Sequence, residues 1–143
     1  MLDVSDIMTP RQTLVVIHPD STVDEVRRVM ATHKIRHLPV LDDAGELVGL
    51  VSQTDVLVAG NGGARLVRDI MVRDPDTVDE RDKLRHAALL MFRRKRSCLP
   101  VMRDGELRGI VTDSDFLSVA ITLMEQSEAV EPDGDDIDNP DDL

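Results

Sequence analysis

Gly49-Leu50-Val51-Ser52-Gln53-Thr54-Asp55 is a heptad that returns sixty residues later as Gly109-Ile110-Val111-Thr112-Asp113-Ser114-Asp115. Each copy predicts a short buried strand, at 47–51 and at 107–111, that runs into a helix. The first turn of each predicted helix carries hydroxyl groups and a carboxylate. Such groups can hydrogen-bond the oxygens of a ribose and of a phosphate. The chain carries this chemistry twice.

The match between the two halves extends well beyond the heptads. Val4–Met8 aligns with Val67–Met71, and Leu38–Val40 aligns with Leu99–Val101. A half of about 60 residues buries only a marginal core, so we expect the two halves to share one. The predicted boundaries are residues 1–59 for a first repeat, 60–66 for a Gly-rich linker, 67–124 for a second repeat and 125–143 for an acidic tail that we expect to be disordered.

The hydrophobic periodicity predicts strand, helix, strand, strand, helix in each half. In the first half these elements begin with a strand at Thr13–Ile17 and a helix around Val23–Met30. Strands at His37–Leu41 and Leu47–Ser52 follow, joined by the turn-rich Asp42–Glu46. The predicted fold class is α+β, with two β-α-β-β-α repeats packed through their sheets with pseudo-two-fold symmetry. That symmetry places paired sites in the cleft between the repeats.

The heptads also fit a purely structural role. Ser52 with Asp55, and Thr112 with Asp115, have the spacing of a capping box, which is worth roughly 1 kcal/mol. A helix N-terminus nevertheless attracts anions, and a nearby carboxylate can accept hydrogen bonds from a ribose diol. Capping and binding are compatible, and the recurrence of the polar positions favours binding.

In order and in duplicate, these motifs resemble a tandem pair of CBS domains, named after cystathionine β-synthase and also called a Bateman module. The resemblance covers residues 4 to 121 and rests on both heptads, both Leu-Pro-Val strands and the lead-ins Asp6-Ile7-Met8-Thr9 and Asp69-Ile70-Met71-Val72. It implies an adenosine-containing ligand bound in the cleft between repeats, with AMP, ADP or ATP as the leading candidates. It also implies that one repeat supplies the ribose-phosphate heptad and the other the adenine pocket.

By this resemblance the chain has two ligand sites. The first combines Thr112, Ser114 and Asp115 with Thr9, Val15, Arg36, His37, Leu38 and Pro39. The second combines Ser52, Thr54 and Asp55 with Val72, Asp76, Arg96, Ser97, Cys98, Leu99 and Pro100.

The two predicted sites are not equivalent. Asp76 occupies the position of the aliphatic Val15, and a carboxylate there would repel a phosphate or need a partner if buried. Val72 likewise replaces the hydroxyl of Thr9. We therefore expect the Asp115 site to bind more tightly. Arg36 and Arg96 are the basic residues best placed to reach a polyphosphate.

Composition excludes several other classes of function. The net charge of −11 comes mostly from residues 125–143, which hold nine acids and no bases, so the rest lacks the basic excess of a nucleic-acid binder. No apolar run is long enough to span a membrane and no signal segment is readable, which predicts a cytosolic protein. The histidine spacing matches no metal site, so we expect neither metal nor cofactor beyond a bound nucleotide, and Mg²⁺ only with ATP.

No nucleophile–base pair or Gly-rich phosphate loop is readable, so we expect no enzymatic activity. The leading hypothesis is a stand-alone sensor that signals in trans to an unidentified regulated protein. The resemblance suggests a homodimer formed through apolar helix faces, in residues that equally fit the core, such as Val26, Met30 and Phe92. The alternative is an adaptor that binds no ligand and mediates protein–protein contacts or self-association.

Overall fold

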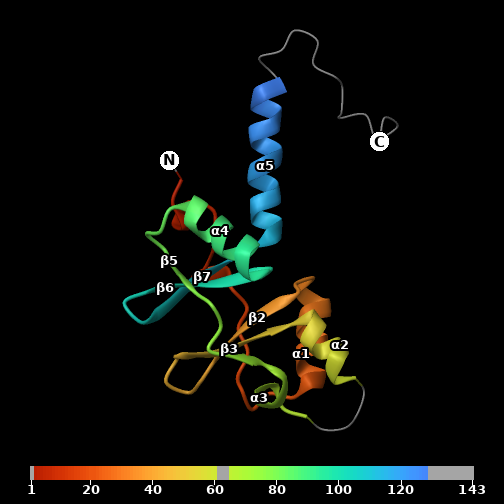
Figure 1. Cartoon of the computed structure of the whole chain (residues 1–143). Helices are drawn as coiled ribbons and strands as arrows, with labels where there is room; N and C mark the ends of the chain where they lie inside the picture. The colour runs from red at the N-terminus through yellow and green to blue at the C-terminus, as the bar shows by residue number, and fades with distance from the viewer. Residues whose placement is uncertain (1, 61–64, 129–143) are drawn as a thin grey trace, which may run out of the picture. The chain divides into compact units, whose positions relative to one another are not determined.

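The structure, a computed structural model, describes residues 2–60 and 65–128. The chain divides into two units, the first ending at Thr112 and the second beginning at Asp113. Both sheets belong to the first unit (Figure 1). Residues 61–64 of the predicted linker and 129–143 of the predicted tail lie outside the described residues.

The order of elements in the first unit repeats itself, as the duplication predicts. The elements are η1 (Val4–Asp6), β1 (Thr9–Pro10), η2 (Arg11–Thr13), α1 (Val23–His33), β2 (His37–Leu41), β3 (Leu47–Ser52), α2 (Gln53–Ala59), α3 (Val67–Ile70), β4 (Val72–Arg73), β5 (Val78–Asp79), α4 (Leu84–Arg94), β6 (Cys98–Arg103) and β7 (Glu106–Thr112). The second unit holds α5 (Asp113–Glu128), so residues 125–128 of the predicted tail are helical. The fold is mixed α+β, as expected.

Each sheet is completed by a short strand from the other repeat. One sheet has the order β2-β3-β4, in which Leu50 of the first repeat pairs with Val72 of the second. The other has the order β1-β7-β6-β5, in which Ile110 of the second repeat pairs with Thr9 of the first. The lead-in segments of the two repeats are therefore exchanged, and the repeats interlock.

The two predicted hairpins are confirmed. β6 and β7 are joined through Asp104 and Gly105, whose φ values of 51° and 82° are both positive, as a type I′ Asp-Gly turn requires. Between β2 and β3, the Gly45 N–H donates to the Asp42 carbonyl over 3.0 Å. Both β-pairs put Pro39 and Pro100 at matching positions, opposite Leu50 and Ile110.

The predicted strand at Thr13–Ile17 is wrong. Its start lies in the 3-10 turn η2, where the Thr13 hydroxyl donates to the Pro10 carbonyl over 3.3 Å. Only Ile17 pairs with β2, by a single parallel bridge to Val40. The chain turns away directly afterwards, because Pro19 has no N–H with which to continue a ladder. In the second repeat the equivalent segment forms the short strand β5, parallel to β6.

The core of the first repeat lies between its sheet and its helices. Among the residues predicted for either core or dimer interface, Val26 and Met30 belong to this core, whereas Phe92 is 82% exposed. Val67, from the lead-in of the second repeat, is fully buried in the same cluster. The buried set is Val23, Val26, Met30, Leu38, Val40, Val51, Val56 and Val67.

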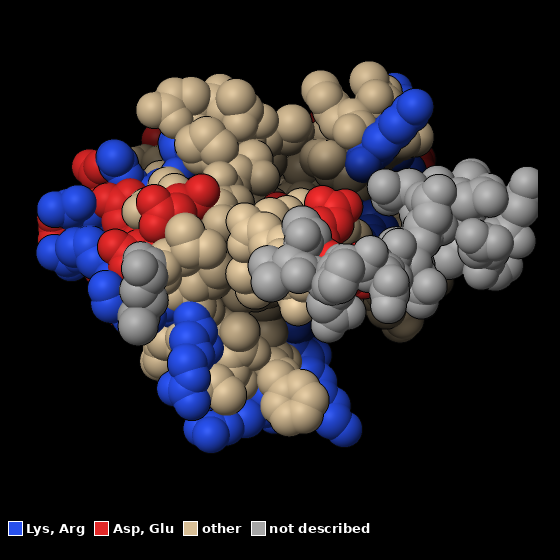
Figure 2. Space-filling view, turned by 90° about the horizontal axis from the view of Figure 1, so that it is seen from above, with Lys and Arg blue, Asp and Glu red and all other residues tan. Residues whose placement is uncertain are grey.

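Glu80 is a charged residue in the interior, whereas most charged side chains of the described residues lie at the surface. On the face shown in Figure 2, basic and acidic side chains of the described residues lie side by side. Glu80, only 7% exposed, accepts hydrogen bonds from Arg103 over 3.0 Å and from Arg108 over 3.4 Å. These guanidinium groups, Arg103 first, hold the pKa of Glu80 below its ordinary range. Glu80 thus stays ionised in a buried position because it is paired.

Candidate functional site

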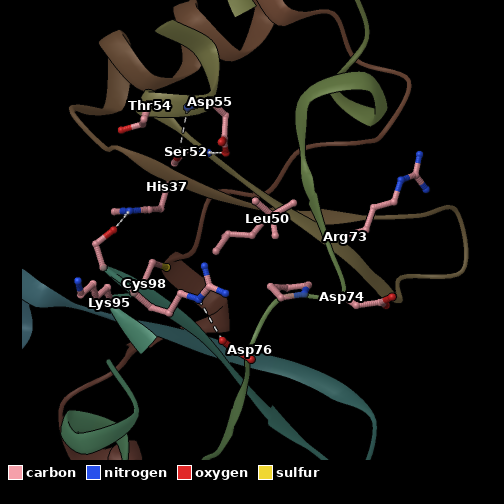
Figure 3. Close-up of a pocket in the computed structure, with 14 residues that line it drawn as sticks. His37, Leu50, Ser52, Thr54, Asp55, Arg73, Asp74, Asp76, Lys95 and Cys98 are labelled. Atoms are coloured by element: carbon pink, nitrogen blue, oxygen red, sulfur yellow. Dashed lines mark hydrogen bonds and ion pairs between the residues drawn. The ribbon is translucent and has the colours of Figure 1, made fainter. Parts of the chain in front are cut away.

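A pocket of about 410 Å³ lies where the first heptad faces the second repeat (Figure 3). Its volume is within the range of pockets that hold small ligands. It lies entirely in the first unit. The lining residues are His37, Leu50, Ser52, Thr54, Asp55, Val72, Arg73, Asp74, Pro75, Asp76, Lys95, Arg96, Ser97 and Cys98.

Ser52, Thr54 and Asp55 form one wall of this pocket, at the point where β3 ends and α2 begins. The capping box expected from the sequence is present: the Asp55 carboxylate accepts from the Ser52 N–H over 2.8 Å, and the Ser52 hydroxyl accepts from the Asp55 N–H over 3.1 Å. This bond uses Oδ2 of Asp55, and a carboxylate carries a second acceptor oxygen. Capping therefore fixes the carboxylate beside the pocket without exhausting its ability to bind hydroxyl groups.

Asp76, which follows β4, lies on the opposite wall, and Arg96 also lines the pocket (Figure 3). Arg96 Nε donates to Asp76 Oδ2 over 3.0 Å, and Arg94 Nη1 donates to Asp76 Oδ1 over 3.4 Å. The Asp76 side chain is 22% exposed. The partner that this unusual carboxylate needs is thus supplied by two arginines of its own repeat.

A polar contact joins the two repeats at the edge of the pocket. His37 Nε2, at the start of β2, lies 2.9 Å from the Ser97 hydroxyl, just before β6 (Figure 3). The two residues come from corresponding ends of the two central hairpins. Cys98 follows and is only 4% exposed, so its side chain is largely covered.

Charge in the lining is balanced. Three carboxylates, Asp55, Asp74 and Asp76, face three basic residues, Arg73, Lys95 and Arg96. Arg73 also donates to the Arg68 carbonyl over 3.3 Å, and Arg96 is engaged by Asp76. The pocket therefore offers acceptors for hydroxyl and amino groups together with donors for anionic groups.

The structure brings together most of the side chains predicted for the Asp55 site. His37, which we assigned to the other site, also lines this pocket. Leu99 and Pro100 do not, because they are buried within β6. Residues that the sequence did not single out include Leu50, Arg73 and Lys95. The first two could have been found from the exchange of the lead-ins, since β4 lies against β3.

The residues predicted for the Asp115 site fall in both units. In the first unit, Thr9 pairs in β1 and Val15 packs against the core of the first repeat. Leu38 and Pro39 are buried in β2, the Arg36 carbonyl accepts from the Gln53 N–H over 2.9 Å, and Thr112 ends β7. In the second unit, Ser114 and Asp115 lie in the first turn of α5, where the Ser114 N–H donates to Asp113 Oδ1 over 2.9 Å.

Two kinds of feature are absent from residues 2–60 and 65–128. Within them, no group of three or more His, Cys, Asp or Glu could hold a metal ion. No helix in the same ranges is both long and apolar enough to cross a membrane.

Known proteins with the same architecture are numerous. The chain is 42% identical over 103 residues to an inosine-5′-monophosphate dehydrogenase from Korarchaeum cryptofilum, covering 71% of this chain and 21% of that enzyme. The crystal structure of CBSX2 from Arabidopsis thaliana in complex with AMP matches with a TM-score of 0.76 and 34% identity, covering 87% of this chain and 99% of that one. The CBS domain pair of protein MJ0100, in complex with 5′-methylthioadenosine and S-adenosyl-L-methionine, matches with a TM-score of 0.80 and 27% identity, over 86% and 98% of the two chains.

The chain spans about a fifth to a quarter of the length of the enzymes among its curated relatives. The matching family model is the CBS domain, which covers residues 4–62 and again 67–122. These matches lie on the two interlocked repeats. The chain therefore belongs to the CBS domain family and is a tandem CBS pair.

Proposed function

We propose that this chain is a regulatory CBS-pair protein that binds an adenosine-containing ligand and signals to a partner protein. AMP, ADP and ATP are the leading candidates for this ligand. The observation that carries the proposal is the pocket lined by Ser52, Thr54 and Asp55 from one repeat and by Arg96 and Ser97 from the other. A ligand held there contacts both repeats at once.

The chemistry of the pocket fits a nucleoside. The second oxygen of the Asp55 carboxylate can accept from ribose hydroxyls, and the hydroxyls of Ser52 and Thr54 can donate to a 5′ substituent. Similar CBS pairs have been crystallised with AMP, and with 5′-methylthioadenosine and S-adenosyl-L-methionine. These ligands share adenosine and differ in the group on the 5′ carbon. Adenosine is therefore the part of the ligand that we assign first.

The proposed mechanism is a shift of population between two arrangements of the repeats. A ligand that touches both walls stabilises the arrangement in which the walls face each other. A partner that binds this arrangement preferentially then gains affinity, typically by about 1–3 kcal/mol of coupling. No catalytic step is needed, and the regulated protein, the homodimer and the cytosolic location stay predictions.

The proposed order of the two sites places the tighter one at Asp115. Its reason is the contrast between Val15 and Asp76: an aliphatic side chain contacts a purine face without an ionic partner, whereas Asp76 is held by Arg94 and Arg96. The Asp55 pocket is then the weaker or more selective of the two.

Thermal-shift and calorimetric titrations with AMP, ADP, ATP, adenosine and S-adenosyl-L-methionine test this function. At least one ligand should raise the melting temperature. Asp115→Asn should remove most of the shift, and Asp55→Asn a smaller part. Asparagine keeps one oxygen for the cap while it removes the charge and one acceptor. A protein that binds none of these ligands contradicts the proposal, and an unchanged Asp115→Asn contradicts the order of the sites.

The exposure of large apolar side chains on α2 and α4 favours a second candidate, the adaptor. Leu57 and Val58 are 73% and 83% exposed, and Phe92 is 82% exposed. Exposed apolar groups of this size are common in protein interfaces. A partner that is retained by the wild type and lost with Phe92→Ser, with no effect of any adenosine ligand, would favour the adaptor over the sensor.

A further inference from the structure

Asp76 is the feature of the pocket that adenosine binding alone does not require. It stands where the first repeat has Val15, so the duplicated fold accepts an uncharged side chain at this position. In the second repeat the carboxylate is held in place by contacts with Arg96 and Arg94. A carboxylate offers about four acceptor directions, and these two contacts leave acceptor capacity that a ligand can use.

The position of Asp76 relative to the heptad defines what it can contact. Ser52, Thr54 and Asp55 lie on one wall, and Asp76 lies on the other (Figure 3). Under the proposed function, Asp55 holds the ribose hydroxyls and Ser52 and Thr54 hold the 5′ substituent, which leaves the base to extend towards the second wall. The group that reaches Asp76 is then an edge of the base rather than the 5′ substituent.

We propose that Asp76 determines base specificity in this pocket by accepting a hydrogen bond from the exocyclic 6-amino group of adenine. This inference rests on the proposed function. Arg96 has the complementary role of a positioning residue, because its guanidinium holds the carboxylate in place. A purine without the amino group leaves the partly buried carboxylate without that donor, which is costly.

The first test needs no change at Asp76. The protein tested is the whole chain carrying Asp115→Asn, which weakens the other site so that the measured binding is that of the Asp55 pocket. Calorimetry compares AMP with purine riboside 5′-monophosphate, which lacks only the 6-amino group. AMP should bind about tenfold more tightly, as expected for a hydrogen bond to a charged acceptor. GMP should bind more weakly than AMP, although guanine also carries donors, because its 6-carbonyl oxygen faces the carboxylate.

The second test changes the carboxylate. Asp76→Val introduces the residue of the first repeat, and AMP and its deamino analogue should then bind with affinities within about twofold of each other. Asp74→Asn is the matched control, because it removes the same charge from the same lining. Asp74 has a φ of 47°, a conformation that asparagine tolerates well. This control should shift both ligands by a similar factor and keep the tenfold ratio.

The outcomes separate the inference from the function on which it rests. If AMP and its deamino analogue bind equally well to the protein carrying only Asp115→Asn, Asp76 does not determine base specificity, while adenosine binding stands. This role of Asp76 is also wrong if Asp74→Asn abolishes the ratio as Asp76→Val does, or if GMP binds more tightly than AMP. If no adenosine ligand binds to any variant or to the wild type, the proposed function itself fails. The analogue comparison holds even where Asp76→Val does not fold.

Discussion

The two copies of the heptad begin with a glycine, but different groups lie against Gly49 and Gly109. A Cβ added at Gly49 would meet Met71 Sδ at 2.6 Å and the Val72 carbonyl oxygen at 3.0 Å. A Cβ added at Gly109 would collide with the Thr9 carbonyl oxygen, a backbone atom of the paired strand β1. Each glycine is thus the point where the lead-in of the other repeat crosses. Two matching motifs can therefore differ in how well they accommodate an added side chain.

The same inequality continues along the two repeats. Directly after the bridge residue Ile17, the first repeat has the exposed pair His18–Asp43, with 2.8 Å between His18 Nε2 and Asp43 Oδ1. The second repeat has the buried Glu80 between two arginines, two residues after Val78, where the first repeat has Pro19 two residues after Ile17. The duplication therefore preserved the backbone plan and the apolar core, whereas the polar contacts diverged.

The largest changes in the free energy of unfolding should come from substitutions at core positions that the two repeats share. Leu38 and Leu99 occupy matching strand positions and are both 0% exposed. Leu38→Ala and Leu99→Ala should each lower the free energy of unfolding by about 2–5 kcal/mol, because each leaves a cavity in a closed core. Urea unfolding should show one transition in both variants, since the repeats are interlocked. Two separate transitions, or a loss in only one variant, would break the equivalence of the cores.

The next prediction concerns the crossing points. Gly109→Ala should cost about 1–3 kcal/mol, because the new methyl group displaces the backbone of β1. Gly49→Ala should cost less, because its nearest neighbour is the flexible end of Met71. Chemical denaturation of the two variants measures the difference. An equal cost would mean that β1 shifts as easily as a methionine side chain.

The buried carboxylate predicts an acid dependence specific to the second repeat. The pKa of Glu80 is lowered by Arg103 and Arg108, and the pKa of Asp79 is lowered by hydrogen bonds from Arg81. A carboxyl group whose pKa is lower in the folded state stabilises the fold at neutral pH, and this stability is lost as the pH falls below about 4. The melting temperature should therefore fall between about pH 5 and pH 3, because the ordinary pKa values of Asp and Glu in the unfolded chain lie near 4.

The variant Glu80→Gln should be less stable than the wild type at pH 7 and should lose less on acidification. Asp43→Asn is the matched control in the first repeat, where the aspartate side chain is 96% exposed. It should change neither the stability nor its pH dependence appreciably. A Glu80→Gln variant with the wild-type pH profile would assign the acid sensitivity to other groups.

The smallest predicted difference lies at the N-termini of the matching helices α1 and α4. Thr22 caps α1, its hydroxyl accepting from the Glu25 N–H over 3.1 Å, whereas Lys83 at the same position of α4 makes no side-chain cap. Thr22→Ala should cost about 1 kcal/mol. Lys83→Thr should stabilise the protein by a few tenths of a kcal/mol, reduced by the loss of the exposed contact with Asp3. Equal changes in thermal unfolding would contradict this assignment of the caps.

Much of the fold could be predicted from the chain itself because the signals were periodic and duplicated. The hairpins β2–β3 and β6–β7 followed from apolar runs around turn residues such as Gly45 and Gly105. The strand at Thr13–Ile17 was wrong because β-branched residues there indicate only a propensity, and Ile17 alone pairs with β2. Tertiary pairing, not local composition, decides which residues of such a run join a sheet.

The candidate site could be predicted only in part. The polar wall at Ser52 and Asp55 was readable, because a hydroxyl and an acid at capping spacing are a local signal. The pairing of Asp76 with Arg94 and Arg96 was not, since it depends on where the last residue of α4 and the segment after it place two long side chains. The sequence indicated that Asp76 would repel a phosphate or need a partner if buried, and only the packing identifies that partner.

The exchange of the lead-ins also has a consequence for the order of folding. Thr9 finds its partner only at Ile110, so β1 must wait for nearly the whole of both repeats. A contact between residues so far apart in the chain closes a long loop, which slows folding compared with local hairpins. During synthesis on a ribosome, the hairpin β2–β3 can form early, whereas the first strand of the protein is among the last to be placed.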